Sequence, residues 1–410
     1  MKLSRRAQSL VSSPSPIMIG HMTCAQDPYS LTNPTGHLNF GTAENHLVDE
    51  FILSKINTPI EHFSENMHYS QLHGIDLFKY TVTNFLNRYL HTEDLKPENL
   101  IVQSGVSAVC EALSFALFDE GDYIIIPTPY YTGFDHDFKK RFKVNFLYAD
   151  LNPTDEFTHH IEAFKLAYES CPEKDKIKAV LITDPHNPTG EVLKENFKSD
   201  IIKFCLDRDL SLISDEIYAL SDHSGASHTS LFQQALSKKV DAHLLYGMAK
   251  DFALGGMKVG FYYSENQEIV KAMQDLSYFH PTSTSTQLLA HQILSDFDFL
   301  DKYIPEMQKR LRPIPPLISQ QLPTLKFIAP EAALFMMLDL SKYCKSFDQE
   351  AEFFNIFLKK YKINISPGSD LGLKTPGFFR VCFAQKKEAV LEFIMRMKKF
   401  AEEEINQKDE

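Results

Sequence analysis

Short, nearly continuous apolar runs recur through the middle of the chain, separated by longer segments with helical periodicity. The runs are 101–103, 123–126, 144–148, 179–183, 210–214, 243–246 and 259–263. Apolar residues without polar alternation are typical of strands that are covered on both faces. Helical patterns at 106–117 and 196–207 lie between such runs, and this succession favours parallel pairing. The pattern therefore predicts an α/β fold with a mostly parallel sheet sandwiched by helices.

The pattern changes near residue 290, where a smaller α+β domain is expected to begin. A long helical pattern at 287–312 is followed by a proline-rich break. Beyond it lie an apolar segment at 333–340, helical patterns at 349–361 and 387–404, and strand patterns at 363–366 and 379–383. A chain of 410 residues is also too long for one core. The predicted division is 1–50, an N-terminal arm and segment that packs on the small domain, 51–295, a large domain, and 296–410, a small C-terminal domain.

Composition narrows the class of partner and the compartment. The formal net charge of −12 argues against nucleic acid as a partner, because an acidic chain repels phosphate backbones. No apolar run has the pattern of a signal peptide or approaches the ~20 residues that span a bilayer. The six cysteines are scattered and form no CxxC pair or His/Cys cluster, which indicates buried thiols rather than disulfides or a metal site. We therefore expect a cytoplasmic protein without membrane association.

Polar and aromatic residues follow several of the predicted strands. In open α/β sheets, ligands bind beyond the carboxyl ends of the strands. The stretches found there are 127–131 (PTPYY), 184–190 (DPHNPTG), 215–218 (DEIY) and 247–250 (GMAK). The sequence therefore predicts that these side chains converge at one edge of the sheet.

No one of these stretches is specific by itself. The string NPTG occurs at 33–36 as well as at 187–190, and Asn-Pro followed by a nearby Gly is commonly a turn. A single strand-end Asp is often a helix cap, and a single Lys is usually a solvated surface residue. Five residues nevertheless follow one another along the chain, each in its own distinctive context, and this order argues against the turn, cap and surface interpretations. They are Asn187, Asp215, Tyr218, Lys250 and Arg380.

With this combination the chain resembles class I/II aminotransferases of fold type I, which depend on pyridoxal 5′-phosphate (PLP). Within that class it more closely resembles 1-aminocyclopropane-1-carboxylate (ACC) synthases. The matching stretches are 33–47, 127–138, 181–191, 214–220, 244–264, 363–370 and 376–384. They follow the family's order over nearly the whole chain. The resemblance implies a PLP-binding large domain, a smaller α+β domain, an amino acid substrate and a homodimer with shared active sites.

The resemblance also assigns roles to individual residues. Lys250 would hold the cofactor as a Schiff base and later move the substrate's α-proton as a general acid/base. Asp215 would keep the ring nitrogen protonated, which makes the ring a better electron sink. Asn187 and Tyr218 would hydrogen-bond the phenolic oxygen of the cofactor. Tyr131 would stack on the ring.

Two anion sites are implied in the same way. Arg380 would clamp the α-carboxylate of the substrate with a bidentate pair of hydrogen bonds. The backbone N–H groups of Gly105, Val106 and Ser107 would bind the cofactor's phosphate at the start of a helix. Lys258 stands where the family has a phosphate-binding arginine, so the charge is kept but the fork of donors is lost.

The predicted phosphate site departs from the family at further positions. Gly247 and Ala249 stand where the family usually has hydroxyl residues, and Ser104 stands where it prefers glycine. Each charge-assisted hydrogen bond lost here would cost ~1.5–3 kcal/mol, so weaker PLP binding is expected unless other residues compensate. Tyr69 matches the aminotransferase tyrosine that reaches the phosphate in the partner subunit.

Three hypotheses of function follow. The first is transamination between an α-amino acid and a 2-oxo acid. The second is formation of ACC from S-adenosylmethionine, supported by Glu44, which matches ACC synthases at a position we assign to substrate binding. Leu72 and His136 stand where ACC synthases have tyrosine and arginine, which favours transamination. The third is a binding protein without catalysis, supported only by the altered phosphate site. The complete set of catalytic residue types argues against it.

Overall fold

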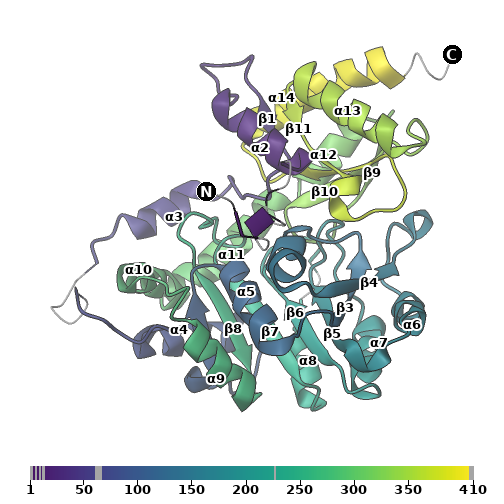
Figure 1. Ribbon diagram of the computed structural model, residues 1–410. Helices are drawn as coiled ribbons and strands as arrows, with labels where there is room; N and C mark the ends of the chain where they lie inside the picture. The colour runs from purple at the N-terminus through teal and green to yellow at the C-terminus, as the bar shows by residue number, and fades with distance from the viewer. Residues whose placement is uncertain are drawn as a thin grey trace.

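The computed structural model describes residues 3–4, 7–8, 11, 14–60, 67–225 and 228–405. A large α/β part contains a seven-stranded sheet, and a smaller part lies above it in the view of Figure 1. The predicted fold class, a mostly parallel sheet flanked by helices, is confirmed. The predicted domain limits near residues 50 and 295 stay predictions, although the second falls at a break between two helices.

The central sheet is parallel except at one strand. Its strands are β2 (Leu100–Gln103), β3 (Tyr123–Thr128), β4 (Asn145–Asp150), β5 (Ile177–Thr183), β6 (Ser211–Asp215), β7 (Ala242–Gly247) and β8 (Gly260–Ser264). They lie in the order β2–β8–β7–β6–β5–β3–β4. β8 runs antiparallel to β2 and β7, and the other neighbours pair in parallel. The carboxyl ends of the parallel strands therefore meet at one edge.

Helices cover both faces of this sheet and enclose two hydrophobic cores. α5 (Val106–Leu117) and α9 (Gln267–Leu276) cover one face. The helices of the other face are α4 (Asp76–Tyr89), α6 (Ile161–Ser170), α7 (Glu195–Leu206) and α8 (Leu231–Ser237). In β6, Ile213 belongs to the first core and Leu212 to the second. Successive strand residues point to opposite faces of the sheet. Because both faces are buried in a core, apolar residues are needed at every strand position, which explains the apolar runs without alternation.

The smaller part is built on an antiparallel sheet. Its strands are β9 (Lys326–Ile328), β10 (Phe335–Asp339), β12 (Ser366–Pro367) and β13 (Phe378–Cys382), in the order β12–β13–β10–β9. Its longer helices are α13 (Phe347–Lys359) and α14 (Lys387–Phe400). The N-terminal segment contributes α2 (Pro16–Gln26) and β1 (Leu38–Asn39), and β1 pairs in parallel with β11 (Ile363–Asn364). This pairing attaches the N-terminal segment to the smaller part.

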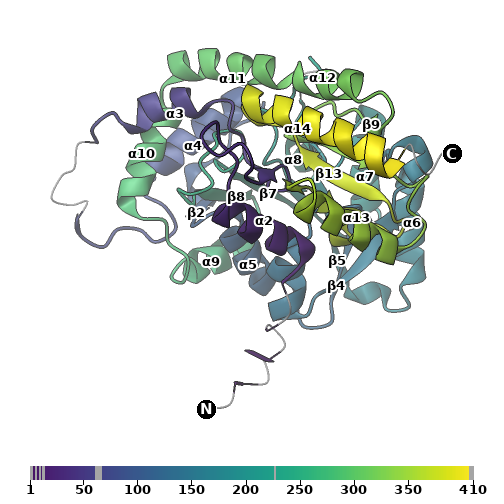
Figure 2. The same cartoon turned by 90° about the horizontal axis from the view of Figure 1, so that it is seen from above.

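The helices between the two parts differ from the single helix predicted over 287–312. The chain forms α10 (Thr284–Leu294) and then α11 (Phe297–Leu311), because the Asp296 side chain accepts a hydrogen bond from the Phe299 N–H at 2.9 Å and starts a new helix. The prolines that follow lie in the first turn of α12 (Ile314–Gln321). The N–H groups of a first turn have no partner within the helix, so proline, which lacks an N–H, costs no hydrogen bond there. Figure 2 shows α12 beside α14.

The remaining elements are short. They are α3 (Asp49–Ile56), the 3-10 turns η2 (Pro97–Asn99), η4 (Pro153–Asp155), η5 (Lys174–Lys176) and η6 (Gly368–Leu371), and the π turns η3 (Asp135–Lys140) and η7 (Ala401–Ile405). In the described part of the chain, no helix has both the length and the apolar composition needed to cross a bilayer.

Candidate active site

A cavity of about 190 Å³ lies at the sheet edge where the parallel strands end. Its lining comes from segments that are far apart in the sequence. The residues are Ser104, Gly105, Val106, Ser107, Cys110, Tyr131, Phe134, Asp137, Asn187, Asp215, Ile217, Tyr218, Ala249, Lys250, Gly255, Lys258 and Val259. Nine of the residues singled out as site candidates in the sequence are therefore brought together. These are Val106, Ser107, Tyr131, Asn187, Asp215, Tyr218, Lys250, Lys258 and the phosphate-loop glycine Gly105.

Lys250 lies in the turn after β7, and its amine reaches across to the N-terminal segment. The Nζ donates a hydrogen bond to the carbonyl oxygen of Ala43 at 2.8 Å. Burial lowers the pKa of Lys250, and the positive charge of Arg380 lowers it further. An amine with a lowered pKa spends more time in the neutral form that acts as a nucleophile or accepts a proton.

Asp215 is the last residue of β6 and is buried in the cavity wall. Its carboxylate accepts hydrogen bonds from Thr183 Oγ1 and from the N–H of Ile217, each at 3.4 Å. Burial raises the pKa of Asp215 to about 7, although these two donors oppose the shift. A cationic ring nitrogen placed against this carboxylate would supply the missing positive partner.

Arg380 comes from the middle of β13 and brings a guanidinium of the smaller part to the same edge. Nη1 donates to Asn187 Oδ1 at 3.0 Å, and Nη2 donates to the carbonyl of Gly41 at 2.7 Å and to Ser366 Oγ at 3.3 Å. Within the described residues its buried Nε has no hydrogen-bond partner, and no carboxylate pairs with the group. A buried cation without a counter-ion is costly, so the site is suited to a carboxylate ligand.

The aromatic residues of the site lie on different sides of the cavity. Tyr218 is buried and packs edge-on against Phe335, with ring centroids 5.2 Å apart. Burial raises the pKa of the Tyr218 hydroxyl well above its ordinary value, which keeps it a hydrogen-bond donor. Tyr131 remains partly exposed and contacts Phe134 edge-on at 5.4 Å. Tyr131 therefore stands at the mouth of the cavity.

The N-terminus of α5 forms one end of the cavity. Gly105 caps this helix with φ +91, a conformation that favours glycine, and Val106 and Ser107 form the first turn. The side chain of Lys258 passes the loop, because a β-carbon at Gly105 would lie 3.7 Å from its Cδ. Backbone N–H groups, a helix dipole and a lysine together fit a phosphate.

Close packing explains one departure from the family pattern. A β-carbon at Gly247 would lie 2.8 Å from both Val106 Cγ2 and the carbonyl of Val259. Because such contacts are closer than van der Waals distance, no hydroxyl side chain fits at this position. Val106 therefore fills the space that a hydroxyl residue would need.

Three predicted site residues do not line the cavity: Arg380 lines an adjoining pocket, and Glu44 and Tyr69 lie elsewhere. The Glu44 carboxylate pairs with His46 at 3.5 Å and lines a separate pocket of about 630 Å³ together with Gln385 and Lys386. Tyr69 is fully exposed, at 103%, and lines none of these pockets among the described residues. The assignment of Glu44 to the substrate and that of Tyr69 to a partner subunit stay predictions.

The structure adds a carboxylate that the sequence reasoning did not select. Asp137 lies on the π turn η3 and lines the cavity close to Cys110. Burial, with the charges of Asp215 and Glu111, raises the pKa of Asp137 to about 8. The residue belongs to the stretch 127–138 that carried the resemblance, which was the available signal.

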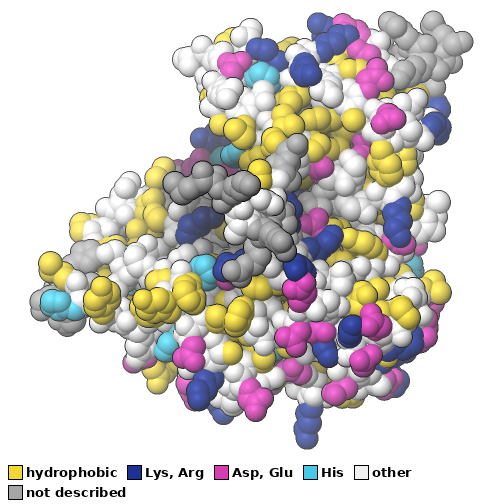
Figure 3. Space-filling view, viewed as in Figure 1, with side chains coloured by type: hydrophobic (Ala, Val, Ile, Leu, Met, Phe, Trp, Pro, Cys, Tyr) yellow, Lys and Arg dark blue, Asp and Glu magenta, His cyan; other side chains and the backbone are white. Residues whose placement is uncertain are grey.

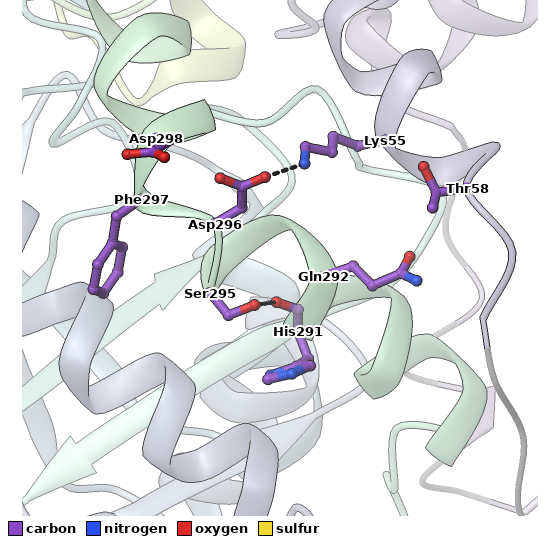
Figure 4. A pocket seen from close by; sticks show the side chains of 8 residues that line it. All are labelled: Lys55, Thr58, His291, Gln292, Ser295, Asp296, Phe297 and Asp298. Atoms are coloured by element: carbon purple, nitrogen blue, oxygen red, sulfur yellow. Dashed lines mark hydrogen bonds and ion pairs between the residues drawn. The ribbon is translucent and has the colours of Figure 1, made fainter.

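A wider hollow of about 610 Å³ lies between α3 and the α10–α11 junction, and its polar side chains do not converge on a common point (Figure 4). Its main interaction is the ion pair between Lys55 and Asp296, which joins α3 to the start of α11. This hollow is a junction between helices. Among the described residues no group of three His, Cys, Asp or Glu side chains could hold a metal ion.

Comparison with known proteins identifies the family. A family model described as aminotransferase class I and II matches residues 36–396, and the chain belongs to this family. ACC synthase 1 of Cucurbita pepo is 30% identical over 417 residues, which cover 97% of this chain and 85% of that protein. ACC synthase 7 of Arabidopsis thaliana is 30% identical over 405 residues, which cover 93% and 91%.

Solved structures that share this fold include aminotransferases. The aspartate aminotransferase of Thermotoga maritima has a TM-score of 0.77 at 20% identity and covers 98% of this chain and 100% of that chain. The aromatic aminotransferase of Pyrococcus horikoshii OT3 has a TM-score of 0.77 at 22% identity and covers 90% and 96%. At such identities the likeness shows the fold alone. The family itself establishes a PLP-dependent enzyme, so the predicted cofactor is confirmed.

Proposed function

We propose that this enzyme transfers an amino group between an α-amino acid and a 2-oxo acid. The observation that carries the proposal is that two groups are present at the same site. Lys250 is an amine with a lowered pKa, and Arg380 is a buried guanidinium that lacks a carboxylate partner among the described residues. The first group can move a proton, and the second can hold the carboxylate of the molecule from which the proton is taken.

The residues of the cavity fit PLP. An amine (Lys250) is available for the aldehyde and a buried carboxylate (Asp215) for the ring nitrogen. The start of α5 and the side chain of Lys258 provide donors for the phosphate. When bound, PLP supplies an aldehyde that captures the substrate's amino group and a ring that accepts the electron pair of the α-carbon.

The protein's own groups then divide the work. Arg380 would bind the α-carboxylate and so fix the orientation of the substrate in the cavity. Lys250 would take the α-proton and return it to a different carbon, a role that its lowered pKa favours because both protonation states are then accessible. With PLP bound, Asp215 would keep a proton on the ring nitrogen, and Asn187 and Tyr218 would hydrogen-bond the phenolic oxygen.

ACC formation from S-adenosylmethionine is the second candidate. The sequence relatives at 30% identity carry that name, and Glu44 matches their pattern. Both reactions require Lys250, Asp215 and Arg380 and differ in what surrounds the distal part of the substrate. Incubation of the PLP-loaded enzyme with S-adenosylmethionine separates them, since release of methylthioadenosine and ACC would contradict the transamination proposal.

Attachment of PLP at Lys250 is tested by absorbance spectra with added PLP, before and after borohydride. We expect wild type to show a band near the visible edge that borohydride traps, and Lys250→Ala to lack it. Lys271→Ala, an exposed lysine on α9, is the matched control and keeps the band. If wild type shows no band at saturating PLP, the proposed role of Lys250 and the transamination proposal both fail.

Assembly and compartment belong to the proposal as well. A homodimer would let Tyr69 of one subunit reach the phosphate site of the other, which accounts for an aromatic residue that is fully exposed in the single chain. All six cysteines are buried, a state that suits the reducing cytoplasm.

A further inference from the structure

A second pocket, of about 370 Å³, continues from the cofactor cavity. The two share Tyr131, and Arg380 lines the second pocket. Its walls come from α2, from η3 and the segment before it, and from η6 of the smaller part. A substrate whose α-carboxylate binds Arg380 therefore has this pocket available for its side chain.

Both acidic side chains of the pocket already have partners. Asp135 accepts a hydrogen bond from the Tyr130 hydroxyl at 3.0 Å and pairs with Lys139 at 2.8 Å. Asp370 accepts from the N–H of Ile17 at 2.9 Å. Burial, followed by a smaller contribution from Glu350, raises the pKa of Asp370, so its negative charge is disfavoured. Each of the two carboxylates of the pocket is therefore already engaged by a partner within the protein.

Besides Arg380, the pocket is lined by one further cation without a carboxylate partner among the described residues, Lys140. Its Nζ lies 3.0 Å from His136 Nε2, and among the described residues no carboxylate lies within ion-pair distance of it. Burial and the neighbouring charge of Lys140 lower the pKa of His136. A neutral imidazole accepts the hydrogen bond from the ammonium, so the pair carries one positive charge, on Lys140, without a counter-ion.

We propose that Lys140 and His136 bind a carboxylate at the distal end of the substrate, so that the enzyme prefers acidic amino acids and the matching dicarboxylic 2-oxo acids. This inference rests on the proposed transamination and names its substrate class. A carboxylate would pair with Lys140 as it pairs with Arg380 at the other end. A sulfonium group, as in S-adenosylmethionine, would be repelled by the same charge. The pocket thus also discriminates against the second candidate reaction.

Equilibrium binding of two unreactive acids to the PLP-loaded enzyme tests the proposal. Succinate and butyrate have the same number of carbons and differ in the second carboxylate, so their dissociation constants isolate its contribution. The readout is the shift of the cofactor's absorbance band, repeated by calorimetry. For wild type we expect succinate to bind at least about tenfold more tightly than butyrate, as one charge-assisted hydrogen bond requires.

Three variants locate the source of the preference. Lys140→Gln should bind the two acids within about twofold of each other, whereas Lys140→Arg should keep most of the preference because it keeps the charge. Lys143→Gln makes the same charge change on the same segment, at an exposed residue outside the pocket that pairs with Glu120, and should behave as wild type.

The outcomes separate this inference from the proposed function. If wild type binds butyrate as tightly as succinate, or if Lys140→Gln keeps the full preference, the distal site is not at Lys140 and the inference is overturned. Transamination of apolar amino acids at rates equal to those of aspartate and glutamate would overturn it too, while leaving the proposed function in place. If no amino acid is transaminated, the proposed function fails whatever succinate does.

Discussion

At the scale of single residues, two carboxyl groups face the cofactor cavity and burial acts on both in the same direction. It raises the pKa of Asp215 to about 7 and, with the charges of Asp215 and Glu111, that of Asp137 to about 8. Both carboxyl groups therefore lose their protons over a similar interval of pH, close to neutrality. The cavity should therefore gain negative charge as the pH rises above neutrality.

Asp137→Asn should make the folded protein less sensitive to high pH. The carboxyl titrates at 3.8 in an ordinary setting and at about 8 in the folded protein, so between these values the folded state binds more protons than the unfolded state. The free energy of unfolding then falls as the pH rises from 4 to 8. The difference in unfolding free energy between the variant and wild type should therefore change with pH. We expect it to favour the variant by more than about 2 kcal/mol more at pH 9 than at pH 5.

Thermal and denaturant unfolding of the protein at the two pH values measure this difference. Asp275→Asn, at an exposed aspartate on α9, is the control and should differ from wild type equally at both. If Asp137→Asn also differs from wild type equally at both pH values, the Asp137 carboxyl of wild type does not titrate near pH 8.

The residues that directly follow strands were predictable, because parallel strands bring their carboxyl ends to one edge. Asn187, Asp215 and Lys250 all line the cavity on that basis. Helical periodicity did not predict Asp137, since a π turn changes which side chains face inward, and its place in the stretch 127–138 was the available signal. The Glu44 side chain points toward His46, with which it forms an ion pair, and no sequence pattern indicates this pair.

At the scale of elements, the phosphate loop is held by backbone contact with β8. A β-carbon at Gly260 would meet the carbonyl carbon of Gly105 and would lie 2.5 Å from the backbone nitrogen of Val106. Backbone atoms cannot move aside as the end of a flexible side chain can. The start of α5 is therefore positioned by the absence of a side chain on the neighbouring strand.

Gly260→Ala should weaken PLP binding by displacing this loop. Overpacking of this kind costs about 1–3 kcal/mol, and we expect at least about a tenfold rise in the dissociation constant of PLP, with a lower unfolding temperature. Gly256→Ala is the matched control, because a β-carbon there would meet no described atom within 4 Å. Titration of both variants with PLP checks the prediction, and equal affinities would contradict it.

The same scale shows a limit of helical periodicity. The pattern over 287–312 is continuous, yet the chain breaks it at Asp296, whose side chain caps α11. A cap inside an otherwise periodic segment competes with continuation of the helix, and packing against α3 decides between them. The sequence patterns predicted the seven strands of the large sheet and several helices of both parts, but they placed this boundary inside a helix.

At the scale of the whole molecule, exposed apolar side chains lie on several faces. Figure 3 shows a row of them on the side where α4, α9 and α10 lie, and others over the smaller part. Met67, Tyr69, Tyr80, Tyr278 and Phe279 are each more than half exposed. Apolar patches of this kind mark interaction sites, and a second copy of the chain is the partner that the Tyr69 proposal requires.

A heterodimer of two inactive subunits should regain activity. We expect Lys250→Ala and Tyr69→Ala homodimers each to be strongly impaired. A dimer with one subunit of each kind has one site with both changes and one with neither, so its activity should reach about half that of wild type. Co-expression with two affinity tags isolates this species. Activity no higher than the mean of the two homodimers would contradict a shared site.

The position of Arg380 in the chain has a consequence for biosynthesis. The residues that line the cofactor cavity all lie between Ser104 and Val259, whereas the substrate clamp lies in β13. Chains are made from the amino end, and domains tend to fold in that order. The surfaces for the cofactor are therefore synthesised more than 100 residues before the guanidinium that binds the substrate. A nascent polypeptide can meet its cofactor long before it can hold an amino acid, and translation itself orders the two events.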